Sequence, residues 1–554
     1  MEMGVLIGVL AVLAIAAAAT IGPRFGVASP LILVAVGILV SLLPFVPALH
    51  IEPEWILAGI LPPLLYSASV SMPSMNFRRE FAAIGGLSVL LVVVSSVVLG
   101  LFFSWAIPGL DLAWGIALGA IVSPTDAVAT SIVKRSGVSP RVVAILEGES
   151  LLNDATALVL LRAAIAAAAA SFAVGTVIWT FTYSVVVAVA LGWAVGRLNL
   201  IVRARVKDAT VNTVLSFTVP FVASLPAEAL GASGLVAAVV AGLVTGSRAP
   251  RVLSPQHRLS DAQNWKTVEL VLEGLVFLTM GLQLFGILQE VEEVHEGVGP
   301  AALVAAGALV LTIVVRAGYV APLLRSLGRR HRRTAAMKPR LETMQKRIAD
   351  ADNDPTALVR QGGPGKGRVP SQRDVGRFTT RIRRTLADID YFTGAPLGWR
   401  EGAVVVWAGM RGAVTVAAAQ TLPTDTPGRQ VLVLIAFLVA AGSLLIQGGT
   451  IGWVLKWLKP AQVDPETENA ERKRVASMLH EAARHIPLPE SRERTPENME
   501  VMKKFALDRL HAQRAALLDA RDDGTFDADV LDRALTNLDA DEISISLKGS
   551  PPEN

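Results

Sequence analysis

The chain has 554 residues, of which 52% are hydrophobic and only 18% are charged, and it contains no cysteine. Soluble domains carry about 25% charged residues, so this composition indicates a membrane protein. The absence of cysteine excludes disulfides, thiolate metal sites and cysteine nucleophiles. The formal net charge of +4 indicates nucleic-acid binding only where basic residues cluster on a folded soluble face.

The first apolar segment, residues 3–20, follows Glu2 instead of a basic region. We interpret it as a retained first span, with a cleaved signal peptide as the less favoured alternative. A helix needs about 20 apolar residues to cross the hydrocarbon core of a bilayer. On this basis the sequence predicts thirteen spans, at residues 3–20, 28–44, 54–70, 81–105, 112–133, 141–169, 174–196, 210–226, 230–246, 266–288, 299–322, 401–420 and 430–457.

The basic residues fix the expected orientation. With the N-terminus outside, the short inner loops hold fourteen Lys and Arg residues, whereas Arg429 is the single one of the outer loops. The acids Glu290, Glu292, Glu293 and Glu296 also lie on the outer side. Because Lys and Arg collect in cytoplasmic loops, we predict an all-α, multi-pass protein of the cell (inner) membrane, N-out and C-in.

Tryptophans near the ends of the predicted spans are typical of anchors at the membrane–water interface. We assign this role to Trp55, Trp105, Trp265 and Trp399.

Two polar segments divide the chain. We expect a membrane domain at 1–324 with spans 1–11, a basic cytosolic loop at 325–399, spans 12 and 13 within 400–458, and a cytosolic tail at 459–554. Residues 325–384 hold 17 basic and 5 acidic residues, and residues 461–554 hold 13 basic and 20 acidic ones. Periodic apolar positions predict tail helices near 466–485, 496–520 and 526–538, with a regulatory role for the tail.

The basic loop has three possible roles. It can bind anionic lipid headgroups or the acidic tail, while a solvated linker is the favoured interpretation. Its QGGPGKGRVP stretch at 361–370 lacks the spacing of a phosphate-binding loop. The basic residues lie in cytosolic segments that flank the spans, and they form no patterned surface. We therefore expect no nucleic-acid partner.

Ionisable residues inside membrane spans are costly and mark functional sites. Four carboxylates occur within 29 residues of the fifth and sixth spans, namely Asp126, Glu147, Glu149 and Asp154. We therefore place the candidate site in these two spans.

Pro124 lies in the middle of the fifth span, where it removes a backbone donor and clashes with the preceding turn. We expect the helix to unwind around Ser123–Asp126. Unwound backbone is tolerated at membrane depth only beside protein or a water-filled cavity. The free carbonyls and the Thr125 hydroxyl then become oxygen ligands for a dehydrated cation.

Helical spacing groups the polar residues of the sixth span. Ser150 and Asp154 are four residues apart and share a face, so a hydroxyl and a carboxylate can meet one ion. Glu147 lies two turns from Asp154 on nearly the same face. Glu149 and Asn153 form a second pair alongside.

Three charged motifs resemble those of the monovalent cation:proton antiporter family one, namely SPTDAVA (123–129), EGESLLNDA (147–155) and WAGMRGAV (407–414). That family includes bacterial and archaeal sodium/proton antiporters and the animal sodium/proton exchangers. The segments LPPLLY (61–66), AEALGASGLVAAVVAG (227–242) and VVRAG (314–318) add to the likeness. The resemblance implies two six-helix inverted repeats, with discontinuous spans five and twelve that cross. It also implies a homodimer in membrane lipid that needs no cofactor.

The resemblance also assigns roles to residues. It implies that Asp154, beside Asn153, alternately holds a proton and a cation, and that Thr125, Asp126 and Ser150 contribute to a Na⁺ site. It implies an ion pair between Glu149 and Arg316, and a structural role for Arg411 in span twelve, where Gly409 and Gly412 permit the break. Ser67 departs from relatives that carry an acidic residue near this place, so a cation ligand from span three is in doubt.

The function that follows is exchange of Na⁺ or Li⁺ for H⁺, with a role in pH homeostasis. A carboxylate in a dehydrated cavity that is either protonated or sodium-bound makes an exchanger, and Asn153 cannot titrate, so we expect an electroneutral 1:1 exchange. The main alternative is K⁺/H⁺ exchange. An intramembrane aspartyl protease using Asp126 and Asp154, or a non-transporting sensor, is a distant alternative. The roles of four further acids stay open, namely Glu147, Glu228, Glu269 and Glu273.

Overall fold

The computed structural model describes residues 2–43, 52–169, 174–293, 297–350, 372–462, 465–489 and 496–547. Within these ranges the chain is helical and contains no β-strand, and an isolated backbone bridge joins Val138 to Gln462. Apart from their ends, helices satisfy their backbone hydrogen bonds internally, which a segment in hydrocarbon requires. The expectation of an all-α, multi-pass membrane protein is confirmed.

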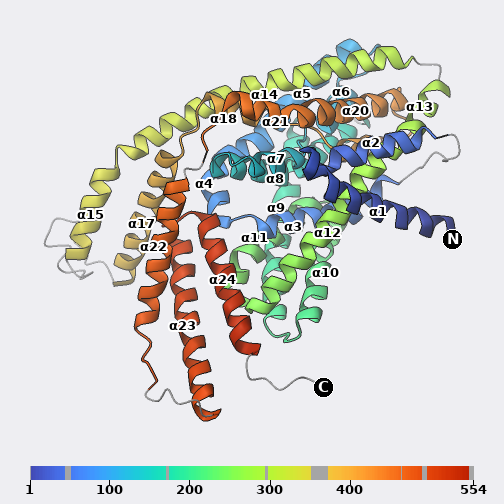
Figure 1. The fold of residues 1–554 in the computed structure, drawn as a ribbon. Helices are drawn as coiled ribbons and strands as arrows, with labels where there is room; N and C mark the ends of the chain where they lie inside the picture. The colour runs from blue at the N-terminus through green and yellow to red at the C-terminus, as the bar shows by residue number, and fades with distance from the viewer. Residues whose placement is uncertain are drawn as a thin grey trace. The chain divides into compact units, whose positions relative to one another are not determined.

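Figure 1 shows the helices in their order along the chain. The first group is α1 (Glu2–Phe25), α2 (Ser29–Ser41), η1 (Trp55–Ile60), α3 (Leu61–Ser71), α4 (Ser74–Gly85), η2 (Gly86–Leu91), α5 (Val92–Ala106), α6 (Leu112–Val122), α7 (Val128–Arg135), α8 (Pro140–Ala169), α9 (Val174–Arg203), α10 (Ala209–Ala229) and α11 (Gly234–Val252). The second is α12 (Pro255–Leu282), α13 (Leu284–Glu293), α14 (Val298–Ala335), α15 (Lys338–Asp350), α17 (Gln372–Gly394), α18 (Trp399–Trp407), α19 (Ala413–Gln420), α20 (Arg429–Ser443), η3 (Leu444–Gly448), α21 (Gly449–Leu458), α22 (Pro465–Arg484), α23 (Pro496–Asp523) and α24 (Ala528–Leu547).

Each of the thirteen predicted spans overlaps a helix or a run of consecutive helices. Nine helical segments among the described residues are long and apolar enough to cross a bilayer, and Ser29–Ser41, Trp55–Ser71 and Leu112–Val122 are shorter apolar helices. The number of spans, their orientation and the inverted repeat stay predictions.

Cα clustering divides the chain into two compact units. The first comprises Met1–Leu253, Ser260–Leu323 and Gly398–Gln462, and the second comprises Ser254–Leu259, Leu324–Leu397 and Val463–Asn554. The apolar spans belong to the first unit, whereas the basic loop and the acidic tail contribute to the second.

Glycines allow helices of the first unit to approach closely. Gly196 on α9 faces α11, where an added Cβ would lie 2.9 Å from the carbonyl oxygen of Ala241. Gly192, one turn earlier, abuts the carbonyl oxygen of Ala237 in the same way. Lipid gives little hydrophobic drive between helices, so this small-residue contact provides the packing that holds α9 against α11.

Two predicted spans are interrupted in the middle. Residues 123–127 separate α6 from α7, and residues 408–412 separate α18 from α19. Pro124 lies in the first break, and Gly409 and Gly412 lie in the second. Both interruptions fall where the sequence predicts them.

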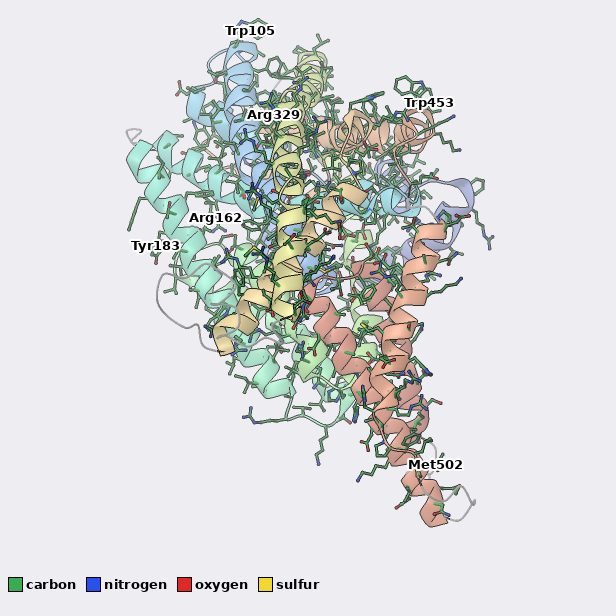
Figure 2. The ribbon with its side chains drawn as sticks, turned by 90° about the vertical axis from the view of Figure 1, so that its left-hand side faces the viewer. Trp105, Arg162, Tyr183, Arg329, Trp453 and Met502 are labelled. Atoms are coloured by element: carbon green, nitrogen blue, oxygen red, sulfur yellow. The ribbon has the colours of Figure 1, made fainter. Side chains whose placement is uncertain are left out.

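The tryptophan anchors divide into two kinds. Trp55, Trp105 and Trp399 have exposed fractions of 69%, 82% and 70%, and Figure 2 shows Trp105 at the end of its helix. The prediction for Trp265 is wrong, because its side chain is buried. Its ring centroid lies 5.3 Å from that of Tyr66, and its Nε1 donates to Ser216 Oγ over 3.0 Å.

The second unit is also helical. Helices α22, α23 and α24 enclose an apolar core that includes Leu517 and Leu531, and these red and orange helices lie side by side in Figure 1. The predicted tail helices 466–485 and 496–520 correspond to α22 and α23. The third extends to Leu547 instead of ending at 538, because Ile545 packs against the same core.

The basic loop contributes a helical pair to this unit. Helices α15 and α17 share a small core formed by Ile348, Ile382 and Leu386. Arg383 of α17 lies 3.3 Å from Asp523 of α23. Of the interpretations left open for this loop, the structure therefore favours contact with the acidic tail. The stretch 361–370 and Glu296 lie outside the described residues.

Candidate functional site

The two helix breaks meet at Asp126. Helix α6 ends at Val122, and the backbone N–H of Asp126 donates to the carbonyl oxygen of Met410 over 2.7 Å. The Asp126 Oδ1 accepts from the backbone N–H of Val128 over 2.8 Å, at the start of α7. A carboxylate at a helix N-terminus satisfies a free backbone donor and interacts favourably with the helix dipole. Asp126 thus ties both breaks together.

The second break owes its shape to two glycines. A Cβ added to Gly412 would overlap the carboxylate of Asp126, and one added to Gly409 would overlap the guanidinium of Arg316. Both positions therefore require glycine for close approach of side chains from other helices.

Arg411 lies in the second break, and its side chain, which is 2% exposed, reaches the end of α6. Its Nε donates to the carbonyl oxygen of Val122 over 3.0 Å, and its Nη1 donates to the carbonyl oxygen of Gly409. Its backbone N–H donates to Ser443 Oγ over 2.9 Å. The last carbonyls of a helix lack intrahelical partners and carry partial negative charge, so Arg411 stabilises the exposed ends of α6 and α18.

A buried network connects the first break to α8 and α14. Glu149 and Arg316 are each 2% exposed and form a two-pronged ion pair, with Arg316 Nη2 2.8 Å from Glu149 Oε2. Thr125 Oγ1 donates to Glu149 Oε1 over 3.1 Å. Asn153 Nδ2 donates to Thr125 Oγ1 over 2.6 Å and to the Thr125 carbonyl oxygen over 3.1 Å. The network holds the unwound segment and the Asn153–Asp154 pair in one arrangement.

A cavity of about 200 Å³ lies beside this network, at the junction of α3, α8, α12 and α19 with the first break. Its lining includes four carboxylates and several hydroxyls, namely Asp126, Asp154, Glu269, Glu273, Thr125, Ser131, Ser150 and Thr415. No Lys, Arg or His among the described residues lines it. The cavity therefore offers hard oxygen ligands and negative charge, which suit a small cation.

Asp154 is the most informative of these carboxylates. It is 9% exposed and has no hydrogen-bond partner among the residues that the structure describes. A buried carboxylate without a partner is costly, so a proton or a cation at this position stabilises it. Ser150 lies one turn earlier, and its hydroxyl donates to the carbonyl oxygen of Glu147 over 3.0 Å. The lone pairs of the Ser150 oxygen can therefore coordinate a cation.

Glu147 lies away from Arg411. Its Oε1 is 2.8 Å from Lys134 Nζ, in a partly exposed pair at the end of α7. Glu147, whose role the sequence leaves open, therefore pairs with Lys134 and not with Arg411. Glu228 pairs with Arg162 at 3.2 Å, where both side chains are exposed.

A larger cavity, of about 690 Å³, is lined by residues that include Phe25, Arg135, Trp453 and Lys456. Its only charged lining residues among those described are basic. Positive charge repels cations, so the smaller acidic cavity is the candidate cation site.

Sequence reasoning left the roles of Glu269 and Glu273 open, and both line the acidic cavity. The signal in the sequence was an i,i+4 pair of acids in an apolar span. Sequence reasoning also missed two further ion pairs. Glu80 and Arg141 form a buried pair at 2.6 Å, and Asp261 and Arg203 form a partly buried one. These pairs lie within the first unit and fix helix ends.

Comparison with known proteins shows which family the chain resembles. The profile described as "Sodium/hydrogen exchanger, transmembrane" matches residues 9–340 and 379–457. An uncharacterized Na⁺/H⁺ exchanger of Escherichia coli K12 is 38% identical over 281 residues, which are 48% of this chain and 50% of that protein. A sodium, potassium, lithium and rubidium/H⁺ antiporter of Bacillus subtilis is 33% identical over 295 residues, which are 51% of this chain and 44% of that protein. The chain thus aligns with about half the length of these two relatives.

The fold has a solved counterpart. The sodium proton antiporter MjNhaP1 from Methanocaldococcus jannaschii superposes with a TM-score of 0.58 at 16% identity, over 83% of this chain and 100% of that one. The relatives are transporters, as the sequence predicts for this chain, and none of these named proteins is an enzyme. Because the profile spans well over half of its residues, the chain belongs to the sodium/hydrogen exchanger family.

Proposed function

We propose that this protein is a secondary active antiporter that exchanges Na⁺ or Li⁺ for H⁺ across the cell membrane by alternating access. The observation that carries this proposal is the acidic cavity at the meeting point of two helix breaks. Asp126 and Asp154 line it together with Thr125 and Ser150, and no basic side chain among the described lining residues neutralises them.

Asp154 is the group that both transported ions share. An ionised carboxylate at 9% exposure with no partner is unfavourable. Protonation removes its charge, and a bound Na⁺ compensates the charge, so the two ions exclude each other. Thr125, Ser150 and Asp126 supply further oxygens. When the loaded or protonated cavity opens to either face in turn, the net result is exchange.

Asn153 determines the proposed stoichiometry. Its side chain cannot titrate, and its Nδ2 is committed to Thr125 at 2.6 Å. One titrating group beside the ion then exchanges one Na⁺ for one H⁺ without net charge movement. No cofactor takes part, because Na⁺ and H⁺ are the substrates.

Three charged residues beside the cavity have a structural role in this proposal. Glu149 with Arg316 holds the unwound segment, and Arg411 stabilises the helix ends at the crossing. We further propose thirteen spans in two inverted repeats, N-out and C-in, with a homodimer as the assembly. The four-part division at residues 324, 399 and 458 belongs to the same proposal.

K⁺/H⁺ exchange is the second candidate. It is favoured by the Bacillus subtilis relative, whose name includes potassium and rubidium, and oxygen ligands alone do not fix ion size. Family membership argues against a protease, and a sensor would show no transport.

Exchange in everted membrane vesicles with a pH-sensitive dye tests the proposal. Wild-type protein should move protons when Na⁺ or Li⁺ is added, and parallel additions of K⁺ and Ca²⁺ define its selectivity. Asp154→Asn should abolish the response, while Glu228→Gln, in the exposed pair with Arg162, should not. Substantial exchange by Asp154→Asn would remove the shared-carboxylate mechanism.

The tail is proposed to modulate the pH response. Truncation after residue 460 should shift the pH profile of exchange in the same vesicles. An unchanged profile with an equal amount of protein in the membrane would contradict this role.

A further inference from the structure

We infer that Glu269 and Glu273 form a two-step carboxylate path that admits the cation to the cavity from the side of Lys134 and Lys266. Glu273 is a further positioning residue for the ion at its inner end. This inference rests on the proposed antiport and adds residues that neither the motifs nor the family profile assign.

Both carboxylates come from one face of α12 (Pro255–Leu282). Their separation of four residues places them one helical turn apart. Both side chains line the same cavity as Asp126 and Asp154, together with Val276 and Phe277 of the same helix. The cavity therefore carries two pairs of carboxylates, Asp126 with Asp154 from the first break and α8, and Glu269 with Glu273 from α12.

Glu273 lies at the inner end. The charged groups close enough to act on it are Asp126, Glu269 and Arg135. Glu273 has no hydrogen-bond partner among the described residues, and it is only partly exposed. A carboxylate in this situation has free oxygens that face the same space as Asp126, so it attracts the ion that approaches Asp154.

Glu269 lies at the outer end. Its Oε2 accepts a hydrogen bond from Ser67 Oγ at 3.5 Å. The charged groups that act on it are Lys266, Lys134 and Glu147, of which Lys134 and Glu147 form the partly exposed pair at the end of α7. Glu269 thus faces the charged rim, whereas Glu273 faces Asp126.

Charge balance supports a path for cations. Four carboxylates line about 200 Å³ without a basic lining residue among those described. Such a concave acidic surface concentrates cations and repels anions. The path also has a direction, because Lys134 and Lys266 act on Glu269 at the rim. Further inside, Asp126 and Arg135 act on Glu273. The ligand class is a monovalent cation that exchanges water for carboxylate oxygens.

The test measures the apparent KM for Na⁺ in proteoliposomes with a pH dye, separately for each face of the membrane. Glu273→Gln should raise the KM roughly tenfold on the face that carries Lys134, with exchange at saturating Na⁺ largely kept. Glu273→Asp should restore much of the affinity. Glu269→Gln should have a smaller effect that high ionic strength reduces, because salt screens a partly exposed charge.

Glu292→Gln is the matched control, since Glu292 is exposed on α13 outside the cavity. Size-exclusion chromatography and thermal unfolding confirm that each variant is folded. If Asp154→Asn is inactive while Glu273→Gln keeps the wild-type KM, the antiport stands and the carboxylate path is wrong. If wild-type protein shows no cation-driven proton movement, the proposed function itself fails.

Discussion

The backbone N–H of Asp126 donates to the carbonyl oxygen of Met410 over 2.7 Å, and this hydrogen bond joins the two helix breaks. Both residues lie in interrupted segments, so this N–H and this carbonyl oxygen have no hydrogen-bond partner within their own helix. Each break therefore satisfies part of the other's exposed backbone, as buried backbone groups require. The position of the Asp126 carboxylate depends on the geometry of the second break.

Gly412→Ala tests this dependence. The added methyl group would overlap the carboxylate of Asp126, and overpacking of this kind costs about 1–3 kcal/mol. We expect exchange in vesicles to fall at least about tenfold, because the oxygens of Asp126 are displaced. Gly318→Ala on α14 is the control, since its Cβ would meet nothing within 4 Å. Equal losses in both variants would contradict a specific contact.

The Glu149–Arg316 ion pair should contribute strongly to the free energy of unfolding of the protein. Both groups are 2% exposed, and removing one partner of a buried pair leaves an uncompensated charge at a cost of about 3–5 kcal/mol. Glu149→Gln should therefore lower the Tm of the purified protein markedly. The double variant Glu149→Gln with Arg316→Gln should recover part of that loss, since no unpaired charge remains. Additive losses in this double-mutant cycle would indicate that the two groups do not interact.

The sequence predicted much of the fold because helices in a bilayer follow from composition. Apolar length predicted helical segments over each of the thirteen ranges, and Pro124 predicted the first break. The errors lie where tertiary contacts decide. Trp265 has the sequence position of an interfacial anchor, but Tyr66 and Ser216 bury it. The extension of α24 follows from the packing of Ile545, which no local pattern reveals.

The candidate site was less predictable than the helices. Spacing along one helix shows which residues share a face, but it does not show what that face meets. Glu269 and Glu273 were visible as an i,i+4 pair, yet only the packing of α12 beside the first break places them in the cavity. The role of Glu147 was open, and its partner proved to be Lys134, which lies in a different helix.

The electroneutral stoichiometry can be tested with membrane voltage. Asn153 carries no charge in either step of the cycle, so an imposed potential should leave the rate of exchange unchanged. The measurement uses proteoliposomes in which a K⁺ gradient with valinomycin sets the potential, with K⁺ transport by the protein itself checked first. A rate that changes with the potential would show that net charge crosses the membrane and that a second carboxylate takes part.

Asp527 makes the tail bundle sensitive to pH. Burial, with Asp529 and Glu471 nearby, raises the pKa of Asp527 from its ordinary value of 3.8 to about 6. Because the folded state binds the proton more tightly, this group stabilises the bundle below about pH 4, and that contribution is lost as the pH rises through about 6. Hydrogen exchange of α24, corrected for intrinsic rates, should therefore report greater protection at pH 5 than at pH 7.

Asp527→Asn separates this group from the other carboxylates. The amide keeps an oxygen for the backbone N–H of Asp529, which lies 2.9 Å from Asp527 Oδ1. Above pH 6 the variant should be more stable than wild type by about 1–2 kcal/mol, with little difference near pH 4. Asp508→Asn, at an exposed position of α23, should change neither value. A variant with the wild-type difference between pH 5 and pH 7 would exclude Asp527 as its source.

Asp539 connects the last helix to the start of α12 within the second unit. Its carboxylate is bonded to Arg258 and to Arg514, with Arg258 Nε at 3.1 Å and Arg514 Nη2 at 2.9 Å. Burial lowers the pKa of Arg258, while Asp539 opposes that shift, so loss of the carboxylate leaves the half-buried guanidinium of Arg258 poorly compensated. Arg514 keeps its ion pair with Glu542. Asp539→Asn should therefore release α24 and speed hydrogen exchange over 528–547 at least about tenfold. Asp541→Asn, two residues away and exposed, should leave the rates unchanged, and equal protection in both variants would mean that this contact does not hold the helix.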